Sequence, residues 1–299
     1  MSPRVSIVVP AYNAEAFIER TLGTVAAQTF QDFEVIVVDD GSKDATFEVA
    51  QKFIAAKGLK GRAIKQQNKM IAGARNTGWR AAQGQLISFL DHDDLWFPDK
   101  LAVVMAEFDK HPGTDLVCHN EELVKDGKVV GVTQNGPLVP RMYERLLFTG
   151  NCLSPSAVTV RKKKLEEVGG FREDAVFNTV EDYDLWMRLS RVCAFRFIET
   201  VLGQYQMVER GASNKVVYHH TNLEHLLRDH FARFPEDNAG TLRQKRRLAW
   251  AWRTAARLLM AQGDAKTAGP YAWRALSGFP LDWKNAATVA IWCAKSAGL

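Results

Sequence analysis

The sequence predicts an α/β fold with a mainly parallel central sheet between helices, followed by a C-terminal helical appendage. Three observations predict it. Over about the first hundred residues, short apolar runs alternate with helical patterns, which favours parallel strands joined by right-handed crossovers. Acidic clusters directly follow two of the apolar runs, at Asp39-Asp40 and at Asp91-His92-Asp93-Asp94. The tail after about Thr221 is rich in Ala, Leu, Arg and Trp, in a mostly helical pattern.

Three of the expected strands are short, mostly apolar runs, and a more polar stretch, 62–66, could form another strand. Together they cover residues 5–10, 33–38, 62–66 and 86–90. The expected helices between them cover about 15–28, 45–57 and 72–82, with Asp44 as a cap of the second and Gly58 as its stop. Because ligands bind beyond the carboxyl ends of such strands, the two acidic clusters should lie on the same rim of the sheet.

The alternation loosens from about residue 116 to about 208, where strands are shorter and helices less clear. In the tail, 248–262 and 265–276 have the pattern of two amphipathic helices joined by Gly263-Asp264. We therefore expect an α/β domain over 1–218, with halves 1–115 and 116–218, and a separate helical region over 219–299.

Composition and charge restrict the partners. The 299 residues are 46% hydrophobic and 24% charged, which is ordinary for a globular protein. The formal net charge is +5, and from His220 onward twelve Lys or Arg stand against six Asp or Glu. A basic tail can meet nucleic acid, an anionic membrane surface or only water. Since the tail contains no recognised nucleic-acid-binding module, we expect no nucleic-acid partner.

The cysteine pattern and the apolar runs indicate a cytoplasmic protein, with contact at the inner face of the cell membrane left open. The four cysteines are widely spaced and form no metal-binding pattern, as expected of reduced thiols. The longest late apolar run, 286–294, is far shorter than the roughly 20 residues that span a bilayer.

The cluster Asp91-His92-Asp93-Asp94 is the first candidate site. Carboxylates at the end of a buried strand need a compensating positive charge, and Mg²⁺ or Mn²⁺ prefers carboxylate oxygens together with substrate phosphates. The alternative is a helix cap, since Pro98 opens a helix soon afterwards and Asp94 or Asp99 would suffice as its cap. Three carboxylates within four residues exceed what capping requires.

Two further motifs follow the same rim. An aspartate in Asp39-Asp40-Gly41-Ser42 could accept hydrogen bonds from a base or ribose, whereas a turn with a helix cap explains the same residues. Arg75 could pair bidentately with a diphosphate, whereas a solvated helical arginine is the ordinary alternative.

A later acidic cluster, Glu181-Asp182-Tyr183-Asp184, leads into a helical pattern. Acids in a first helical turn are favourable for the helix macrodipole, which alone explains them structurally. The functional alternative is a general base held opposite a metal site.

Taken together, these motifs resemble the inverting family 2 glycosyltransferases of the GT-A fold, over residues 5 to about 213. Five segments match in the family's order. They are Val5-Ser6-Ile7-Val8-Val9-Pro10-Ala11-Tyr12-Asn13; Val37-Val38-Asp39-Asp40-Gly41-Ser42; Ala74-Arg75-Asn76; Phe89-Leu90-Asp91-His92-Asp93-Asp94; and Gly169-Gly170-Phe171 followed by Glu181-Asp182-Tyr183-Asp184-Leu185-Trp186. The chain departs from the family at Met70, where a glycine is common, which leaves the shape of that loop open.

The resemblance implies a role for each motif. It implies that Pro10 and Tyr12 line the base pocket, that Asp40 bonds the nucleobase, and that Arg75 faces the diphosphate. It implies that Asp91 approaches the ribose or the metal, that Asp93 ligates Mn²⁺ or Mg²⁺, and that Asp182 is the catalytic base supported by Glu181. The half 1–115 would bind the nucleotide-sugar and the half 116–218 the acceptor.

The expected function is therefore metal-dependent, inverting transfer of a sugar from a nucleotide-diphospho-sugar to a hydroxyl of a saccharide or lipid-linked acceptor, in surface polysaccharide biosynthesis. The basic tail would make peripheral contact with a membrane, or with a partner, or would only pack on the catalytic domain. Two other functions stay open: a catalytically degenerate binding or scaffold protein, and a sugar nucleotidyltransferase. The latter needs a glycine-rich basic loop after the first strand, where this chain has Pro10-Ala11-Tyr12-Asn13-Ala14.

Overall fold

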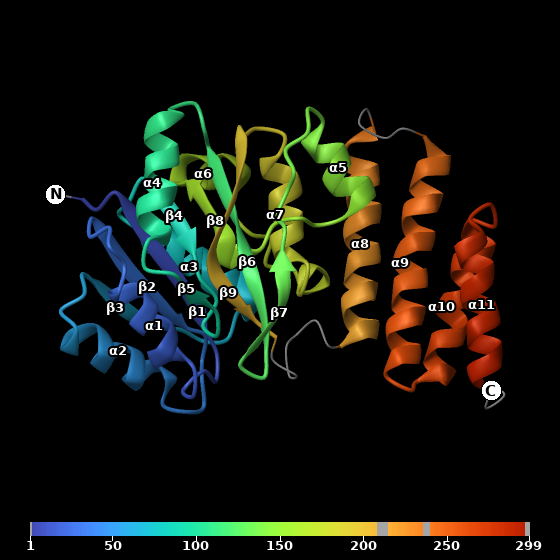
Figure 1. Ribbon diagram of the computed structural model, residues 1–299, viewed down its shortest axis with the longest axis horizontal. Coiled ribbons are helices and arrows are strands. Elements are labelled where there is room, and N and C mark those ends of the chain that lie inside the picture. The colour runs from blue at the N-terminus through green and yellow to red at the C-terminus, as the bar shows by residue number, and fades with distance from the viewer. Residues whose placement is uncertain (1, 208–214, 236–239, 297–299) are drawn as a thin grey trace. The chain divides into compact units, whose positions relative to one another are not determined.

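A computed structural model describes residues 2–207, 215–235 and 240–296 of the chain (Figure 1). It contains two compact units. The first comprises Met1–Tyr143, Asn151–Glu173 and Glu181–Glu209, and the second comprises Glu144–Gly150, Asp174–Val180 and Arg210–Leu299. The domain division at residue 218 stays a prediction. Ser213, where the family resemblance ends, lies outside the described residues.

The first unit is built on one mixed sheet. Within the described residues its strand order is β3-β2-β1-β4-β8-β6-β9-β5, with β7 paired to β6. The strands are β1 (Val5–Ala11), β2 (Phe33–Asp39), β3 (Gly61–Lys65), β4 (Leu86–Phe89), β5 (Leu95–Trp96), β6 (Leu116–Lys125), β7 (Lys128–Thr133), β8 (Val158–Arg161) and β9 (Phe195–Gln206). The pairs among β3, β2, β1 and β4 are parallel, as is β6 with β9. The α/β fold class is thus confirmed, and the loosened region after residue 115 supplies antiparallel strands.

Helices follow the strands in the order that the sequence predicts. In the first unit they are α1 (Ile18–Ala26), α2 (Thr46–Ala56), α3 (Met70–Ala81), α4 (Lys100–Lys110), α6 (Lys162–Val168) and α7 (Glu181–Leu189), with a 3-10 turn η1 (Pro155–Ala157). The first helix begins later than expected, because the backbone N–H groups of both Phe17 and Ile18 bond the carbonyl of Ala14 in a turn. Gly58 ends the second helix segment with φ of 61°, as expected of a stop.

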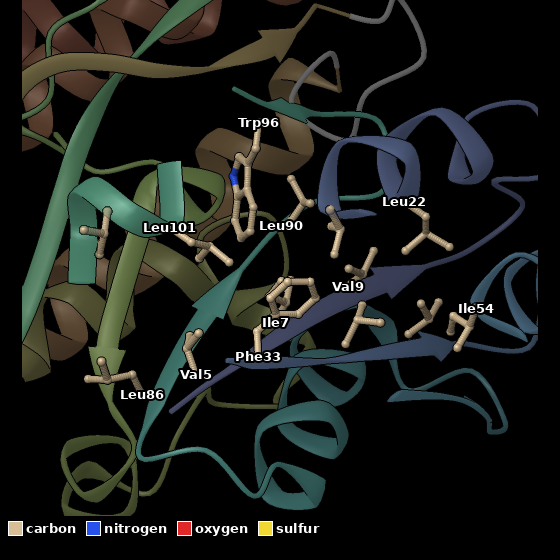
Figure 2. Packing of buried hydrophobic residues seen from close by; sticks show 14 of the residues in the cluster. Val5, Ile7, Val9, Leu22, Phe33, Ile54, Leu86, Leu90, Trp96 and Leu101 are labelled. Carbon is tan, nitrogen blue, oxygen red and sulfur yellow. The ribbon is translucent and has the colours of Figure 1, made fainter. Parts of the chain in front are cut away.

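The two faces of the central strands are covered by different helices. Successive side chains of a strand point to opposite faces. Ile7 and Val9 of β1 therefore share one core with Leu22 of α1, Ile54 of α2 and Leu101 of α4 (Figure 2). Every residue of β1 and β2 is buried, as in a parallel sheet covered on both faces.

Helix α3 packs on the other face of β1. A Cβ atom added at Gly78 would lie 2.3 Å from Cγ1 of Val8, so only glycine allows this approach. The close packing fixes α3 against the sheet and with it the position of Arg75, one turn earlier on the same helix.

The carboxyl ends of the parallel strands lie on one rim, as predicted. Register pairs Ala11 at the end of β1 with Asp39 at the end of β2, and Val8 of β1 with Phe89 of β4. Just past the strand ends, the N–H of Asp40 bonds the carbonyl of Ala11 at 2.8 Å. The segments after β1, β2 and β4 therefore leave the sheet together, which brings the two predicted acidic clusters to the same edge.

The second unit is helical. Its helices are α8 (Val216–Arg233), α9 (Thr241–Ala261), α10 (Ala265–Gly278) and α11 (Trp283–Ser296), with most of α5 (Met142–Thr149) and the 3-10 turn η2 (Ala175–Phe177). The two predicted tail helices are confirmed as α9 and α10, and Asp264 caps α10 by accepting the Thr267 N–H at 3.0 Å. Small residues such as Ala255, Ala256 and Ala272 let α9 and α10 pack closely around one core. No described helix is long and apolar enough to cross a membrane.

Candidate active site

Arg75 joins two of the predicted acidic clusters. Its Nη2 atom lies 2.8 Å and 3.1 Å from the two carboxylate oxygens of Asp91, just after β4. Its Nη1 atom lies 2.7 Å from Oε1 of Glu181, at the start of α7. The Arg75 and Glu181 side chains are only 2% and 5% exposed, against 22% for Asp91. The ion pairs thus link residues that lie 106 positions apart in the sequence, and the Asp91 side chain is the most solvent-exposed of the three charged groups.

Asp182 lies next to this chain of charges and is partly exposed. Its Oδ2 atom accepts a hydrogen bond from the Asn151 side-chain amide at 3.3 Å. Burial raises the pKa of Asp182 to about 7, the neighbouring Glu181 carboxylate adds to the rise, and Arg75 opposes it. A carboxylate with a pKa near neutral pH is a competent proton acceptor, so the position suits a general base.

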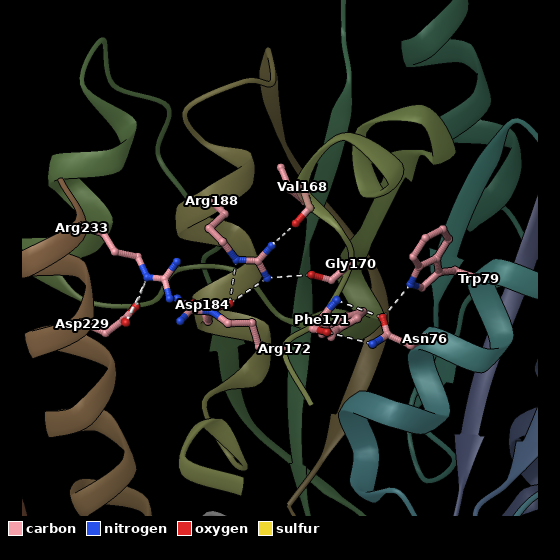
Figure 3. A network of polar contacts seen from close by, with 10 residues as sticks. All are labelled: Asn76, Trp79, Val168, Gly170, Phe171, Arg172, Asp184, Arg188, Asp229 and Arg233. Atoms are coloured by element: carbon pink, nitrogen blue, oxygen red, sulfur yellow. Dashed lines mark hydrogen bonds and ion pairs between the residues drawn. The ribbon is translucent and has the colours of Figure 1, made fainter. Parts of the chain in front are cut away.

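Asp184, in the same motif, has a structural role. It is fully buried and is paired with Arg172 at 2.5 Å and with Arg188 at 2.7 Å (Figure 3). Arg188 also donates to the carbonyls of Val168 and Gly170, at 2.7 Å each. The acids at the start of α7 therefore divide between the charged site and the packing of the Gly-Gly-Phe turn.

The Gly169-Gly170-Phe171 turn is held by Asn76 of α3 (Figure 3). The Asn76 side chain accepts from the N–H of Phe171 at 3.0 Å and donates to its carbonyl at 2.8 Å. The guanidinium of Arg75 lies 5.4 Å from the centre of the Phe171 ring. The Ala-Arg-Asn segment is therefore a scaffold: Asn76 fixes the turn, and the turn packs beside Arg75.

Asp94 organises the loop after β4 instead of capping a helix. Ser156 of η1 donates its hydroxyl to Oδ2 of Asp94 at 2.6 Å and accepts the backbone N–H of Asp91 at 3.0 Å. The other Asp94 oxygen accepts the N–H of Gln206 at 2.9 Å. Asp99 precedes α4, but its side chain makes no capping bond there. The capping alternative therefore does not account for this cluster.

Asp93 and Asp91 are the residues to test against a divalent cation. Burial raises the pKa of Asp93, the His92 charge opposes this, and the Asp91 carboxylate adds to it, so a nearby cation would stabilise the ionised form of Asp93. Within the described residues no group of three or more His, Cys, Asp or Glu side chains could hold a metal alone. Two hard oxygen donors fit Mg²⁺ or Mn²⁺ when a diphosphate supplies further oxygens. Asp91 is already paired with Arg75, which leaves Asp93 the less committed carboxylate.

The three residues predicted to line the base pocket differ in their burial and in their hydrogen bonds. Asp40 is 3% exposed, and its Oδ1 atom accepts from the Gln66 amide at 2.7 Å and from the Lys69 N–H at 2.9 Å. Tyr12 is 42% exposed after the end of β1. Pro10 is buried at that end, and its carbonyl lies 3.2 Å from Nδ1 of His92. Contacts of all three residues with a nucleobase stay predictions.

Met70 resolves the loop shape that the sequence left open. Its backbone φ is 60°, in the left-handed region that glycine adopts most readily. The Met70 N–H donates to the side-chain oxygen of Asn68 at 3.1 Å, which holds the turn into α3. The loop therefore keeps the conformation that suits the family's glycine although a bulkier residue occupies the position.

Sequence reasoning missed three residues of the site: Ser156, Asn151 and Tyr205. Tyr205 of β9 is 37% exposed. Burial raises the pKa of its phenol, and the carboxylates of Asp94, Asp91, Asp93 and Asp182 raise it further. The phenol of Tyr205 therefore stays protonated within the electrostatic reach of these carboxylates. All three residues come from the middle region. Asn151 and Ser156 lie in the stretch 151–160, which by the family resemblance starts the acceptor side, but neither residue was named as part of the site, and nothing in the sequence indicated Tyr205.

Comparison with known proteins bears on this arrangement. A family model described as glycosyl transferase family 2 matches residues 6–169. Chondroitin synthase of Escherichia coli is 34% identical over 217 residues, which cover 72% of this chain and 30% of that protein. The amylovoran biosynthesis glycosyltransferase AmsB of Erwinia amylovora is 30% identical over 219 residues, covering 70% of this chain and 71% of that protein. The chain spans about a third of the length of the first curated relatives it matches, 30% to 36% of each.

Solved structures share the fold at low identity. TarS of S. aureus, in its 1–349 form with UDP-GlcNAc, superposes with a TM-score of 0.62 at 19% identity, covering 100% of this chain and 92% of that one. The mannosyltransferase PcManGT from Pyrobaculum calidifontis, in complex with GDP-Man and Mn²⁺, gives a TM-score of 0.61 at 22% identity, covering 99% and 86%. At these identities the likeness shows the fold alone, and the fold is the GT-A-like arrangement that the motifs predict.

Proposed function

Since the chain belongs to glycosyl transferase family 2, we propose that it transfers a sugar from a nucleotide-diphospho-sugar to an acceptor hydroxyl, with inversion and with the help of Mn²⁺ or Mg²⁺. The acceptor in this proposal is a saccharide or a lipid-linked glycan, and the setting is surface polysaccharide biosynthesis in the cytoplasm. The named relatives support that setting, since one makes chondroitin and another serves amylovoran biosynthesis.

The observation that carries the proposal is the joined set of charges Asp91–Arg75–Glu181 with Asp182 beside it. A binding module has no need for a carboxylate whose pKa is raised to about 7 at the edge of a buried ion-pair chain. The same carboxylate suits proton removal from a hydroxyl near neutral pH. The arrangement therefore favours catalysis over the scaffold alternative.

In the proposed reaction, Asp182 takes the proton of the acceptor hydroxyl as its oxygen attacks the anomeric carbon of the donor. The new carbon–oxygen bond forms as the bond from that carbon to the diphosphate breaks, and the electron pair leaves with the nucleoside diphosphate. Glu181, held by Arg75, stays fixed behind the base and keeps its pKa high. Positioning supplies much of the rate, since a carboxylate alone is a weak base.

Asp93, with Asp91, would hold the cation at the rim. When bound, Mn²⁺ or Mg²⁺ would neutralise charge on the leaving diphosphate. The solved neighbours with UDP-GlcNAc and with GDP-Man and Mn²⁺ support a donor of this class without naming the base or the sugar here. Both terminal nitrogens of Arg75 are already paired with carboxylates, so we propose that it acts on the donor through Asp91 more than by direct phosphate contact.

The test of the base is Asp182→Asn, with Asp174→Asn as the matched control. Asp174 is an exposed carboxylate in the same region of the sequence that lies outside the linked set of charges. We expect Asp182→Asn to lower turnover by about 10²- to 10⁴-fold, with nucleoside-diphosphate binding retained by calorimetry. Asp174→Asn should turn over like the parent protein.

Near-normal turnover of the purified Asp182→Asn variant would make the base assignment wrong. Loss of nucleotide binding together with turnover would instead indicate that the substitution disturbs the fold of the site. The circular dichroism spectrum and Tm of the two variants separate these cases.

A further inference from the structure

The second unit exposes tryptophans that its own core does not use. Trp283 is 72% exposed and Trp250 is 36% exposed, and Leu281, just before α11, is 77% exposed. Two other tryptophans of the unit are packed and bonded. Trp252 donates its indole N–H to Glu224 at 2.7 Å, and Trp292 donates to the carbonyl of Ala265 at 2.7 Å.

The contrast between the two kinds of tryptophan is informative. Among the described residues, neither Trp250 nor Trp283 donates its indole N–H to a protein group. The centre of the Trp250 ring lies 4.7 Å from the guanidinium of Arg247, whereas no such ring contact engages Trp283 among the described residues. Trp side chains carry a large apolar surface and one polar atom, so an exposed tryptophan is suited to an environment that is apolar at one end and wet at the other. Packing in the helical core therefore accounts for Trp252 and does not account for Trp283.

Two of the three exposed tryptophans of this unit, Trp250 and Trp283, line one groove between α9 and α11. The groove has a volume of about 580 Å³. It is lined by Trp250, Arg253, Thr254, Arg257, Leu258, Trp283 and Lys284. The residues of α9 among these recur every three or four positions, which places them on one side of that helix. Apolar and cationic side chains therefore alternate on a single surface, which we call the tryptophan groove.

The charge of this part of the chain is strongly positive. Residues 240–296 contain ten Lys or Arg and two Asp or Glu. Both acids are engaged, since Asp282 pairs with Arg253 at 2.6 Å and Asp264 caps α10. Lys284 is exposed at the groove, and Arg257 uses only its Nε atom in a hydrogen bond to Thr288 at 3.2 Å. Three of the ten cations are engaged by groups outside this range: Arg243 pairs with Glu144, Arg274 pairs with Glu224, and the buried Arg247 donates to the carbonyl of Leu147. An anionic surface would therefore meet the cations that stay exposed, among them Arg257 and Lys284 at the groove.

We infer that the tryptophan groove is a docking surface for an anionic lipid bilayer, with Trp283 and Leu281 at the level of the headgroups and Arg257 and Lys284 against lipid phosphates. Three observations carry the inference together: the exposure of Trp283 and Leu281, the groove that Trp283 and Trp250 share with basic residues, and the exposed cations Arg257 and Lys284 in that groove. Basic clusters beside apolar side chains are the surface chemistry that anionic leaflets attract. The inference concerns binding in the second unit and is independent of the proposed transfer reaction.

Docking at the surface agrees with the helices themselves. No described helix is long and apolar enough to cross a membrane, so contact would be interfacial. An acidic protein partner would satisfy the cations, but it would not call for an indole and a leucine that are more than two-thirds exposed at one turn. A bilayer interface satisfies the cations and the apolar tip together.

The test is co-sedimentation of the full chain with phosphatidylcholine vesicles, with and without phosphatidylglycerol. We expect sedimentation only with the anionic vesicles, weakening as salt is raised. Trp283→Ala should weaken binding about tenfold or more, since its apolar surface would no longer be buried. Lys284→Gln should weaken it about fivefold, because a basic side chain near an anionic surface contributes about 1 kcal/mol.

Two matched controls lie in the same unit. Trp273 of α10 is 52% exposed and does not line the groove, and Lys266 of α10 is an exposed lysine outside it. Trp273→Ala and Lys266→Gln should stay within about twofold of the parent protein. Release of nucleoside diphosphate in vesicle-free buffer should be the same in all four variants, so failure of docking and failure of the transferase proposal give different results.

Sedimentation that is absent, or equal with both kinds of vesicle, would overturn the inference. An equal loss of binding in the Trp273→Ala control would overturn the assignment to this groove. If the chain formed a dimer that Trp283→Ala dissociates, and bound no vesicles, the groove would belong to a second copy instead.

Discussion

Asp182 shows how neighbours decide the chemistry of one residue. A solvated aspartate has a pKa near 4 and is a poor base, whereas here burial and the Glu181 carboxylate raise the pKa to about 7. Arg75 forms ion pairs with both Glu181 and Asp91. Because its positive charge is divided between them, it opposes the rise in the pKa of Asp182 only in part. The raised pKa is therefore a property of the joined set and not of the Glu-Asp motif alone.

This property predicts the pH dependence of the reaction. Asp182 must be ionised to accept a proton, and with a folded-state pKa of about 7 it is mostly protonated below that pH. We therefore expect kcat/KM to fall as pH is lowered through about 7 and to level off above it, as for a single ionisation of the free enzyme. A pH–rate profile from pH 5 to 9 with saturating metal measures it. A profile that is flat through pH 6 to 8 would contradict the assigned environment.

Met70 gives a prediction about stability at the residue scale. Its φ of 60° is strained for any residue with a Cβ atom. Because Met70 is 52% exposed, its side chain contributes little packing. Met70→Gly should therefore unfold at higher denaturant concentration than Met70→Ala, by about 1 kcal/mol in the free energy of unfolding. Equal stability of the two variants would mean that the loop does not hold the left-handed conformation.

At this scale the sequence could predict contiguous acids but not their partners. Asp91, Asp93 and Asp182 stand in short motifs, so their presence at a strand end or helix start is readable. The ion pairs of Arg75 with two carboxylates could not be predicted, because those partners lie 16 and 106 positions away in the sequence. Ser156 and Tyr205 come from segments without periodic pattern, and only the folded chain brings them to the acids.

Among the elements, the turn between α6 and α7 is the most tightly constrained. A Cβ atom at Gly170 would lie 2.6 Å from Oδ1 of Asn76 and 2.7 Å from the Trp79 ring, and φ is 72°. At Gly169 φ is 79°, but nothing lies within 4 Å of an added Cβ atom. Both glycines therefore adopt a backbone conformation that would strain an alanine, and they differ in the space available for an added Cβ atom.

Gly170→Ala should lower the free energy of unfolding by more than Gly169→Ala. The left-handed backbone should cost both variants about 1 to 2 kcal/mol, and the clash of the added Cβ atom should cost Gly170→Ala about 1 to 3 kcal/mol more. Chemical unfolding of both variants measures the difference. Gly170→Ala should also lower turnover, since the turn packs beside Arg75. If Gly169→Ala were the more damaging substitution, the account of this turn would be wrong.

Element prediction succeeded where periodicity is strong. The four expected strands and three expected helices of the first hundred residues are all present. Strands β1, β2 and β4 are buried and read as continuous apolar runs, and amphipathic helices repeat every three to four residues, whereas β3 is largely exposed. Strands β6 to β9, whose pairs are antiparallel except for the parallel pair β6–β9, were not located. β6 and β9 carry polar and charged residues such as His119, Glu121 and Arg196, and their pairing is set by partners far along the chain.

At the scale of the whole chain, the family and the fold class could be read from ordered motifs, and the role of the tail could not. The second unit includes Glu144–Gly150 and Asp174–Val180, which lie within the predicted catalytic domain in sequence. The composition of these two segments does not indicate that they belong to the second unit. The positive charge of the tail was visible in the sequence, whereas its coincidence with two exposed tryptophans in one groove required the structure.

The central claim is metal-dependent transfer from a nucleotide-diphospho-sugar at the rim formed by Asp91, Asp93 and Asp182. The measurement that tests it most directly is release of nucleoside diphosphate from a panel of UDP- and GDP-sugars, with Mn²⁺ or Mg²⁺ and then with EDTA. We expect release of nucleoside diphosphate from at least one donor, even by slow hydrolysis. EDTA should abolish this release, and Asp93→Ala should remove it. Binding and release of no donor in the presence of metal would contradict it.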